Sequence, residues 1–306
     1  MKMLKLRTLF ALLISLTMIF AACDETTSPE EPKPKPDAPS NMRATSIDHQ
    51  TISLRWDLSA SESNTLFRRY VLTIEPGVFA PIYFDKGVNN AEVDNLTEGT
   101  VYTFTLKAEY TNGEVSTSSA TVQWSPATRF TLNAFDNDIK VYEAASSFGS
   151  GLDLFDKDNG GPATWTVGAA AKWNLALDTR SSALILASPK LVDYNYTGVP
   201  PTVHIAETVI ESEDLNQVYD SQALNAKNFA ERSINLKNYN KSIVLIVRLI
   251  EPGETEFTYA KVLVKYVSGG FLQGTTPNRF VQFYISYQKT PGVPYAKVGQ
   301  NGNSQD

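Results

Sequence analysis

Short segments in which apolar and polar residues alternate one for one recur along this chain, and they constrain its fold more than any other feature. Ile52, Leu54 and Trp56 share one face of such a segment. The same alternation runs through 70–74, 102–108 and 120–124. A period of two puts the apolar side chains of a β-strand on one face. Several short strands within about 90 residues predict a β-sandwich over residues 38–127.

The same segment resembles a fibronectin type III domain. The resemblance is carried by Pro39, by Trp56 and by Leu96-Thr97-Glu98-Gly99-Thr100-Val101-Tyr102, which is similar to the family's Leu-x-Pro-Gly-Thr-x-Tyr signature. Glu98 stands where the family usually has proline. The resemblance implies a structural motif made of Trp56, Leu96, Gly99 and Tyr102. Leu96 would close one end of the core, Gly99 would permit a turn, and the Tyr102 hydroxyl would bond back to the backbone.

Residues 128–306 keep a β-like pattern but lose that signature. Strands are expected at 139–142, 165–167, 172–177 and 183–187. Residues 242–249 are nearly all apolar, as in a strand buried on both faces. Together with the segments 257–267 and 280–287, they predict an antiparallel meander. A short helix is expected at 223–231. The predicted fold class is therefore all-β, a fibronectin type III sandwich followed by a second antiparallel β domain.

The N-terminus has the pattern of a signal peptide. Three cations, Lys2, Lys5 and Arg7, precede an apolar run over residues 9–20, which is shorter than the roughly 20 residues that cross a bilayer. The stretch Phe20-Ala21-Ala22-Cys23 resembles the lipobox of bacterial lipoproteins. This resemblance implies that residues 1–22 are removed and that palmitate and other acyl chains attach to Cys23. Such an anchor would hold the protein in the cell envelope.

Residues 23–37 are expected to form a tether, because alternating proline and charge favours an extended chain over a packed core. Acidic residues soon after Cys23 resemble the surface-export signal of some Gram-negative lipoproteins. This resemblance implies an outer-membrane, surface-exposed location. Removal of residues 1–22 takes away three positive charges and moves the formal net charge from −6 to −9. An acidic chain repels phosphate backbones, so nucleic acid is not an expected partner.

Few residues offer catalytic or metal chemistry. Cys23 is the single cysteine, and the two histidines are His49, in a polar turn, and His204, on an expected strand. Zinc sites draw on several Cys and His residues, so no metal site is expected. Clustered acidic and amide residues precede a Gly-Gly-Pro turn; they are Asp153, Asp156, Asp158 and Asn159. Their spacing does not fit an EF-hand loop, so a solvated acidic turn is expected.

A weaker resemblance concerns the C-terminal half. Residues 173–177 (Trp-Asn-Leu-Ala-Leu), 259–262 and 283–288 are similar in sequence and order to stretches of the HmuY-type haem-binding lipoproteins. That family captures haem between two His or Met side chains. His204 is the one conventional ligand here, because the methionines all lie at or before Met42. The tyrosines of this half could stack on sugars or a porphyrin, but they are also ordinary strand residues.

The leading expectation is a lipid-anchored binding or adhesion protein of the cell envelope, with no catalytic activity and no cofactor. Its partners would be the membrane, through Cys23, and a protein or small ligand that the sequence does not identify. Two alternatives remain open: haem capture, and a carbohydrate-active or carbohydrate-binding protein. A deep aromatic pocket beside His204 would favour haem capture. Converging carboxylates would favour an enzyme, and a flat apolar patch would favour binding of a partner protein.

Overall fold

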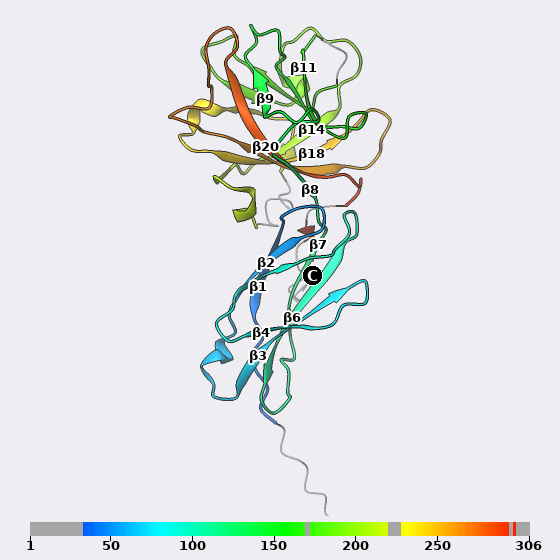
Figure 1. The fold of residues 1–306 in the computed structure, drawn as a ribbon, viewed down its shortest axis with the longest axis vertical. Coiled ribbons are helices and arrows are strands. Elements are labelled where there is room, and N and C mark those ends of the chain that lie inside the picture. The colour runs from blue at the N-terminus through cyan, green and yellow to red at the C-terminus, as the bar shows by residue number, and fades with distance from the viewer. Residues whose placement is uncertain (1–32, 169–171, 220–227, 294–295, 298–306) are drawn as a thin grey trace, which may run out of the picture. The chain divides into compact units, whose positions relative to one another are not determined.

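The computed structural model describes residues 33–168, 172–219, 228–293 and 296–297. Within these residues the chain is all-β, with twenty-one strands, four short 3₁₀ helices and no α-helix. Compact packing begins at Lys35 and includes everything that follows in the described chain. The ends of the alternating segments coincide closely with the strand ends (Figure 1).

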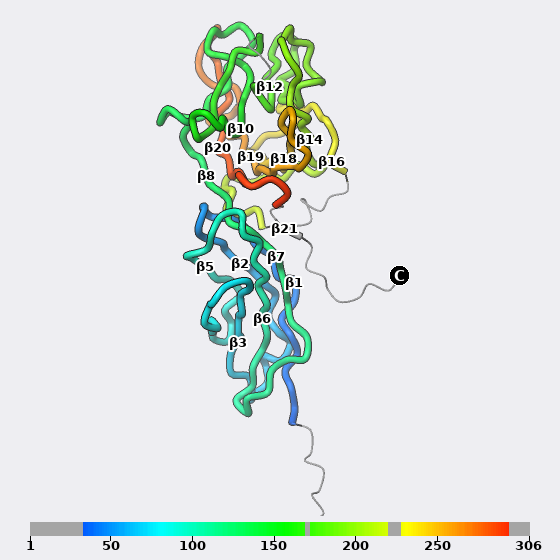
Figure 2. Tube along the Cα trace, turned by 90° about the vertical axis from the view of Figure 1, so that its right-hand side faces the viewer, coloured from blue at the N-terminus to red at the C-terminus, as the bar shows by residue number. Residues whose placement is uncertain are grey.

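The first part of the chain forms a two-sheet sandwich. Its strands are β1 (Ser40–Ser46), β2 (Ile52–Asp57), β3 (Phe67–Glu75), β4 (Ile82–Asp85), β5 (Asn90–Val93), β6 (Tyr102–Tyr110) and β7 (Ala120–Trp124), with the 3₁₀ helix η1 (Ala60–Ser63) between β2 and β3. One sheet has the order β1-β2-β5, and the other has the order β21-β7-β6-β3-β4. The edge strand β21 (Ala296–Lys297) comes from the C-terminal end of the chain and pairs antiparallel with β7 (Figure 2).

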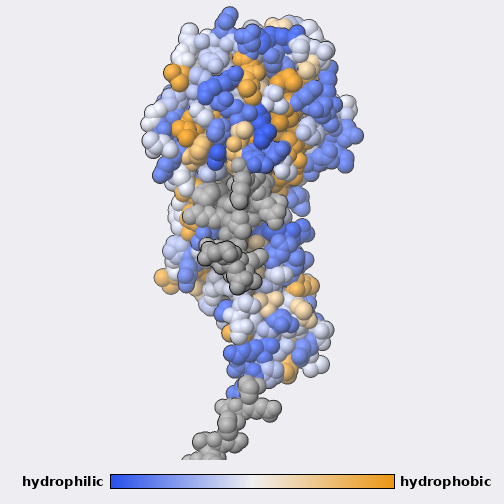
Figure 3. Space-filling view, turned by 180° about the vertical axis from the view of Figure 1, so that it is seen from behind, coloured by the Kyte–Doolittle hydropathy of each residue, from blue (hydrophilic) through white to orange (hydrophobic). Residues whose placement is uncertain are grey.

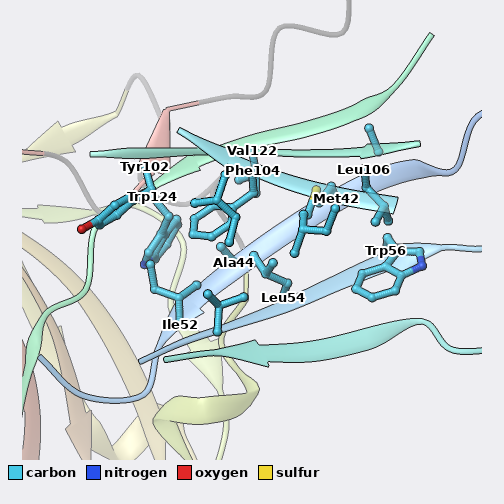
Figure 4. Packing of buried hydrophobic residues seen from close by; sticks show 14 of the residues in the cluster. Met42, Ala44, Ile52, Leu54, Trp56, Tyr102, Phe104, Leu106, Val122 and Trp124 are labelled. Carbon is cyan, nitrogen blue, oxygen red and sulfur yellow. The ribbon is translucent and has the colours of Figure 1, made fainter. Parts of the chain in front are cut away.

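Alternation explains the core of this sandwich. Side chains at every second position of facing strands meet between the two sheets, where Met42, Ala44 and Leu54 lie across from Phe104 and Leu106 (Figure 4). The largest buried side chains of the cluster are aromatic, and Trp56, Tyr70 and Trp124 are each at most 1% exposed.

The rest of the chain, which we call the C-terminal region, contains two further antiparallel sheets. The first has the order β11-β10-β12-β13-β17. Its strands are β10 (Gly151–Asp156), β11 (Gly161–Trp165), β12 (Leu175–Asp178), β13 (Ile185–Ala187) and β17 (Ser233–Asn235). The second has the order β16-β14-β18-β19-β20-β8, with β15 and β9 attached to β18 and β20. Its strands are β8 (Thr128–Phe130), β9 (Ile139–Tyr142), β14 (Thr202–Ala206), β15 (Ile210–Glu211), β16 (Phe229–Ala230), β18 (Ile243–Ile250), β19 (Thr258–Val264) and β20 (Phe280–Gln288).

The central strand β18 is buried on both faces because each face of its sheet covers a different core. Ile243, Leu245 and Val247 point into the core shared with the five-stranded sheet. Val244 and Ile246, together with Leu263 of β19, belong to the core cluster of the first sandwich. The predicted meander of β18, β19 and β20 is therefore confirmed, and its second face is covered by the first sandwich.

Three expectations about local structure need correction. The strand expected at 165–167 is wrong, because β11 runs from Gly161 to Trp165 and ends where that strand was expected to begin. The helix expected at 223–231 lies mostly outside the described residues, and its described end contains the strand β16 instead. The acidic turn also differs, because Asp153 and Asp156 lie on β10 and are 8% and 7% exposed. The 3₁₀ helices η2 (Pro189–Leu191), η3 (Leu215–Gln217) and η4 (Leu236–Asn238) occupy connections in this region.

Candidate functional site

The four motif residues lie in the first sandwich. Trp56 is 1% exposed and packs against the rings of Tyr70 and Phe84. Leu96 is 2% exposed, and the hydroxyl of Tyr102 accepts a hydrogen bond from the backbone N–H of Thr97 at 3.1 Å. The loop that contains Leu96 and Gly99 packs against the C-terminal region. A side chain at Gly99 (φ +85°) would collide with Thr290.

Glu98, the residue that replaces the usual proline, connects the loop to the C-terminal region. Its carboxylate accepts hydrogen bonds from the backbone N–H and the hydroxyl of Thr128, at 2.9 and 2.8 Å. Thr128 is the first residue of β8, so a direct side-chain contact fixes the start of the second sheet. The one departure from the family signature was therefore the sequence signal for this contact, although we did not predict its partner.

A buried lysine crosses the same junction. Lys261 of β19 is 1% exposed, and its Nζ donates to Thr45 Oγ1 at 2.9 Å and to the carbonyl of Val218 at 2.7 Å. The Trp124 ring lies 5.0 Å from the same nitrogen. Hydrogen bonds from Arg129 to the Ser46 carbonyl add to this junction. One end of the first sandwich is therefore occupied by contacts within the chain.

The C-terminal region contains an open cavity of about 550 Å³. Its lining mixes aromatic, apolar and planar polar side chains, from Glu143, Ala144, Ala145, Val167, Gly168, Thr179, Arg180, Asp193, Tyr194 and Asn195. The residues come from four separate stretches of chain, which begin after β9, after β11, after β12 and after η2. Because these stretches are dispersed, the cavity could not be predicted from the sequence, although Tyr194 was among the tyrosines considered for ligand stacking.

Ion pairs hold two of the charged residues that line the cavity. Arg180 binds both carboxylate oxygens of Asp178, at 2.9 and 2.7 Å, and its guanidinium lies 4.0 Å from the centre of the Tyr194 ring. The Arg180 hydrogen bonds hold the pKa of Asp178 below its usual value. Burial raises the pKa of Tyr194 to about 12, and its hydroxyl donates to the Leu177 carbonyl.

Another lining residue, Glu143, is 3% exposed and accepts hydrogen bonds from Arg279 on both carboxylate oxygens. These hydrogen bonds lower the pKa of the Glu143 carboxyl. Two charged residues of the lining, Glu143 and Arg180, are therefore each paired with an opposite charge.

Two carboxyl groups with raised pKa values lie elsewhere in the C-terminal region. Burial, with smaller contributions from the charges of Glu251 and Asp156, raises the pKa of Asp153 to about 7. Burial also raises the pKa of Glu251, which accepts a hydrogen bond from Asn174 at 3.1 Å. The same Asn174 side chain accepts from the backbone N–H of Leu154, so it ties β10 to the end of β18. Neither carboxyl group lines the cavity of 550 Å³.

His204 is a half-buried strand residue with its own partners. Arg248 donates to His204 Nδ1 at 3.3 Å, and the Arg248 guanidinium lies between the rings of Phe229 and Phe257. Burial and the Arg248 charge lower the pKa of His204. His49 lies in an exposed bend of the first sandwich. These contacts of His204 and Arg248 therefore link neighbouring strands, and no second histidine lies beside His204.

Several remaining expectations concern residues or groups that the structure describes only in part. Cys23 and the signal segment lie outside the described residues. Within those residues, no cluster of three or more His, Cys, Asp or Glu side chains is placed to hold a metal ion. Likewise, no described helix has the length and apolar content needed to cross a membrane. On the face shown in Figure 3, hydrophobic and hydrophilic residues are interspersed over the C-terminal region.

Comparison with known proteins identifies the first sandwich. The model of the family "Fibronectin type III domain" matches residues 37–124, so this segment is a fibronectin type III domain. A search of curated proteins finds no match to the chain.

Solved structures that the chain matches include the type III domain of human fibronectin type III domain containing protein 3, at 20% identity and a TM-score of 0.27 over 32% of this chain and 93% of that one. The FN5 domain of Drosophila Lar has 20% identity and a TM-score of 0.22, over 30% of this chain and 97% of that one. The chicken CNTN1 FN1-FN3 domains align with 84% of this chain and 90% of theirs, at 10% identity and a TM-score of 0.25.

Proposed function

We propose that this chain is a lipid-anchored, non-catalytic binding protein of the cell envelope, in which the fibronectin type III domain supports the C-terminal region and the latter binds the ligand. The observation that carries the proposal is the junction at Glu98 and Lys261. These contacts occupy one end of the type III domain with the protein's own chain, as suits a supporting element. The preformed cavity near Arg180 gives the C-terminal region a surface on which a ligand can bind.

The anchor is part of the same proposal and rests on the stretch Phe20-Ala21-Ala22-Cys23. Acylation of Cys23 would attach the chain to the outer membrane, and residues 24–34 would separate the anchor from the folded part. Two or three acyl chains hold a protein stably on a membrane, whereas one chain gives only marginal binding.

Metabolic labelling with radioactive palmitate in a bacterial host tests the anchor. The wild-type chain should incorporate label and sediment with membranes, and Cys23→Ser should do neither. Ser28→Ala, five residues further on, is the matched control and should behave as the wild type. Surface exposure is then measured by treating intact cells with protease. Label in the Cys23→Ser variant, or none in the wild type, would show that the lipid-anchor proposal is wrong.

A further inference from the structure

We propose that the cavity between Arg180, Asp193, Tyr194 and Asn195 is a binding site for a neutral saccharide. The inference rests on the proposed binding function and names the ligand class of the C-terminal region. Its volume of about 550 Å³ falls within the range of cavities that take up small ligands.

Unused hydrogen-bonding groups in the cavity point to a ligand rich in hydroxyls. Arg180 has five N–H groups, and its hydrogen bonds to Asp178 and to the Asp193 carbonyl use three of them. The side chains of Asp193 and Asn195 line the cavity, and neither makes a hydrogen bond within the described part of the chain. Donors and acceptors are thus available side by side, which matches hydroxyl groups that both donate and accept.

The charge of the cavity selects against an anionic ligand. Glu143 is neutralised by Arg279, and Arg180 is neutralised by Asp178. Asp193 adds one exposed carboxylate, whose charge also acts on Arg180, so that three carboxylates surround two guanidinium groups. A phosphate, sulfate or uronate would therefore approach three carboxylates and find both guanidinium groups already paired, which favours a neutral ligand.

The apolar part of the lining fits the C–H faces of a sugar ring. Val167, Ala144 and Ala145 stand beside the polar groups, and the Tyr194 ring is held in place by Arg180 at 4.0 Å. Because Arg180 and Tyr194 are already held by an ion pair and a ring contact, little of their conformational freedom is lost on binding.

Binding of the full chain to an array of neutral, sulfated and uronic-acid oligosaccharides tests the site, followed by calorimetric titration with the neutral glycan that binds best. Asp193→Ala combined with Asn195→Ala should weaken that binding by at least tenfold. The matched control combines Asp94→Ala with Asn240→Ala, both exposed elsewhere, and should stay within twofold of the wild type. Thermal midpoints of both double variants should match the wild type, because none of these side chains makes a hydrogen bond in the described structure.

The inference is wrong if no neutral glycan binds, if only anionic glycans bind, or if both double variants bind alike. Chromatography of the glycan after incubation shows whether the glycan has been cleaved. This measurement tests the proposed non-catalytic function separately from the binding site. A glycan that binds through Asp193 and Asn195 and is then cleaved would support the site while contradicting a non-catalytic protein. An unbound glycan with intact palmitate labelling would contradict the site and leave the anchored protein in place.

Discussion

At the scale of single residues, Asp153 shows how far burial can move a group from its expected behaviour. The neighbouring Asp, Asn and Gly residues indicated a solvated turn, but Asp153 continues β10 and is only 8% exposed. Burial raises the pKa of Asp153 from 3.8 to about 7. The neighbouring Asp156 is also buried, and its carboxylate accepts hydrogen bonds from Asp158 and Asn159.

This raised pKa predicts that Asp153→Asn stabilises the protein at high pH. The folded state keeps its proton up to about pH 7, whereas the unfolded state loses it near pH 3.8, so the stability from this group is complete below pH 3.8 and is lost as the pH rises through 7. At pH 8 the variant should exceed the wild type in unfolding free energy by about 1–4 kcal/mol, at about 1.4 kcal/mol per pKa unit. Urea denaturation at pH 4 and pH 8 measures the difference, which should vanish at pH 4.

The control for this measurement is Asp94→Asn, which alters an exposed carboxylate of the type III domain. It should leave the unfolding free energy within about 0.5 kcal/mol of the wild type at both pH values. The raised pKa of Glu251 acts in the same direction, so some pH dependence should persist in Asp153→Asn. Equal effects of the two substitutions at pH 8 would contradict the burial of a protonated Asp153.

His204 carries a second prediction at this scale, against tight haem binding. Arg248 donates to Nδ1, which places the ring proton on Nε2 and leaves no free lone pair for iron. A low-spin haem also needs a second strong axial ligand, and the sequence has no other histidine or methionine after Met42 and His49. Titration of the full chain with haemin should give at most a weak, broad Soret change, equal in His204→Ala and His49→Ala. A sharp low-spin spectrum lost only in His204→Ala would establish haem capture instead.

At the scale of elements, the sequence predicted strands well where alternation was strict and less well where it was broken. The expected strand at 139–142 coincides with β9, and the three strands of the meander lie where the pattern put them. The segment 172–177 includes Trp173 and Asn174, which lie before β12 and serve as a packing surface and a side-chain bridge. Contacts of this kind leave no periodic pattern in the sequence, because they depend on residues that are distant along the chain.

The loop before β6 gives a prediction about Tyr102. Its hydroxyl is the hydrogen-bond acceptor for the backbone N–H of Thr97, so Tyr102→Phe leaves that N–H without its partner. The substitution should lower the unfolding free energy by about 1–3 kcal/mol. Tyr83→Phe, which removes a hydroxyl from a half-exposed ring of the same domain, is the control and should change it little. Equal midpoints for the two variants in urea would rule out a structural role for the Tyr102 hydroxyl.

At the scale of the whole molecule, the organisation depends on one sheet that serves two cores. The apolar pattern of β18 predicted burial on both faces, and the covering surface on one side is the type III domain itself. Neither the partner surface nor the cavity could be predicted, because each joins stretches of chain separated by tens to hundreds of residues. Lys261 illustrates the limit, since a lysine in an alternating strand normally indicates a solvent-facing position.

This shared sheet predicts that the type III domain and the C-terminal region unfold together, and that Lys261→Glu separates them. A carboxylate at this position could not donate to Thr45 Oγ1 or to the Val218 carbonyl, and burying a charge that has lost its hydrogen bonds costs several kcal/mol. Lys261→Met is the matched control, because it keeps an unbranched side chain, one atom shorter, and removes the charge. Scanning calorimetry should show one transition for the wild type and for Lys261→Met, and two for Lys261→Glu. Two transitions in the wild type would mean that the junction does not couple the two parts, and the type III domain could then no longer be regarded as a rigid support.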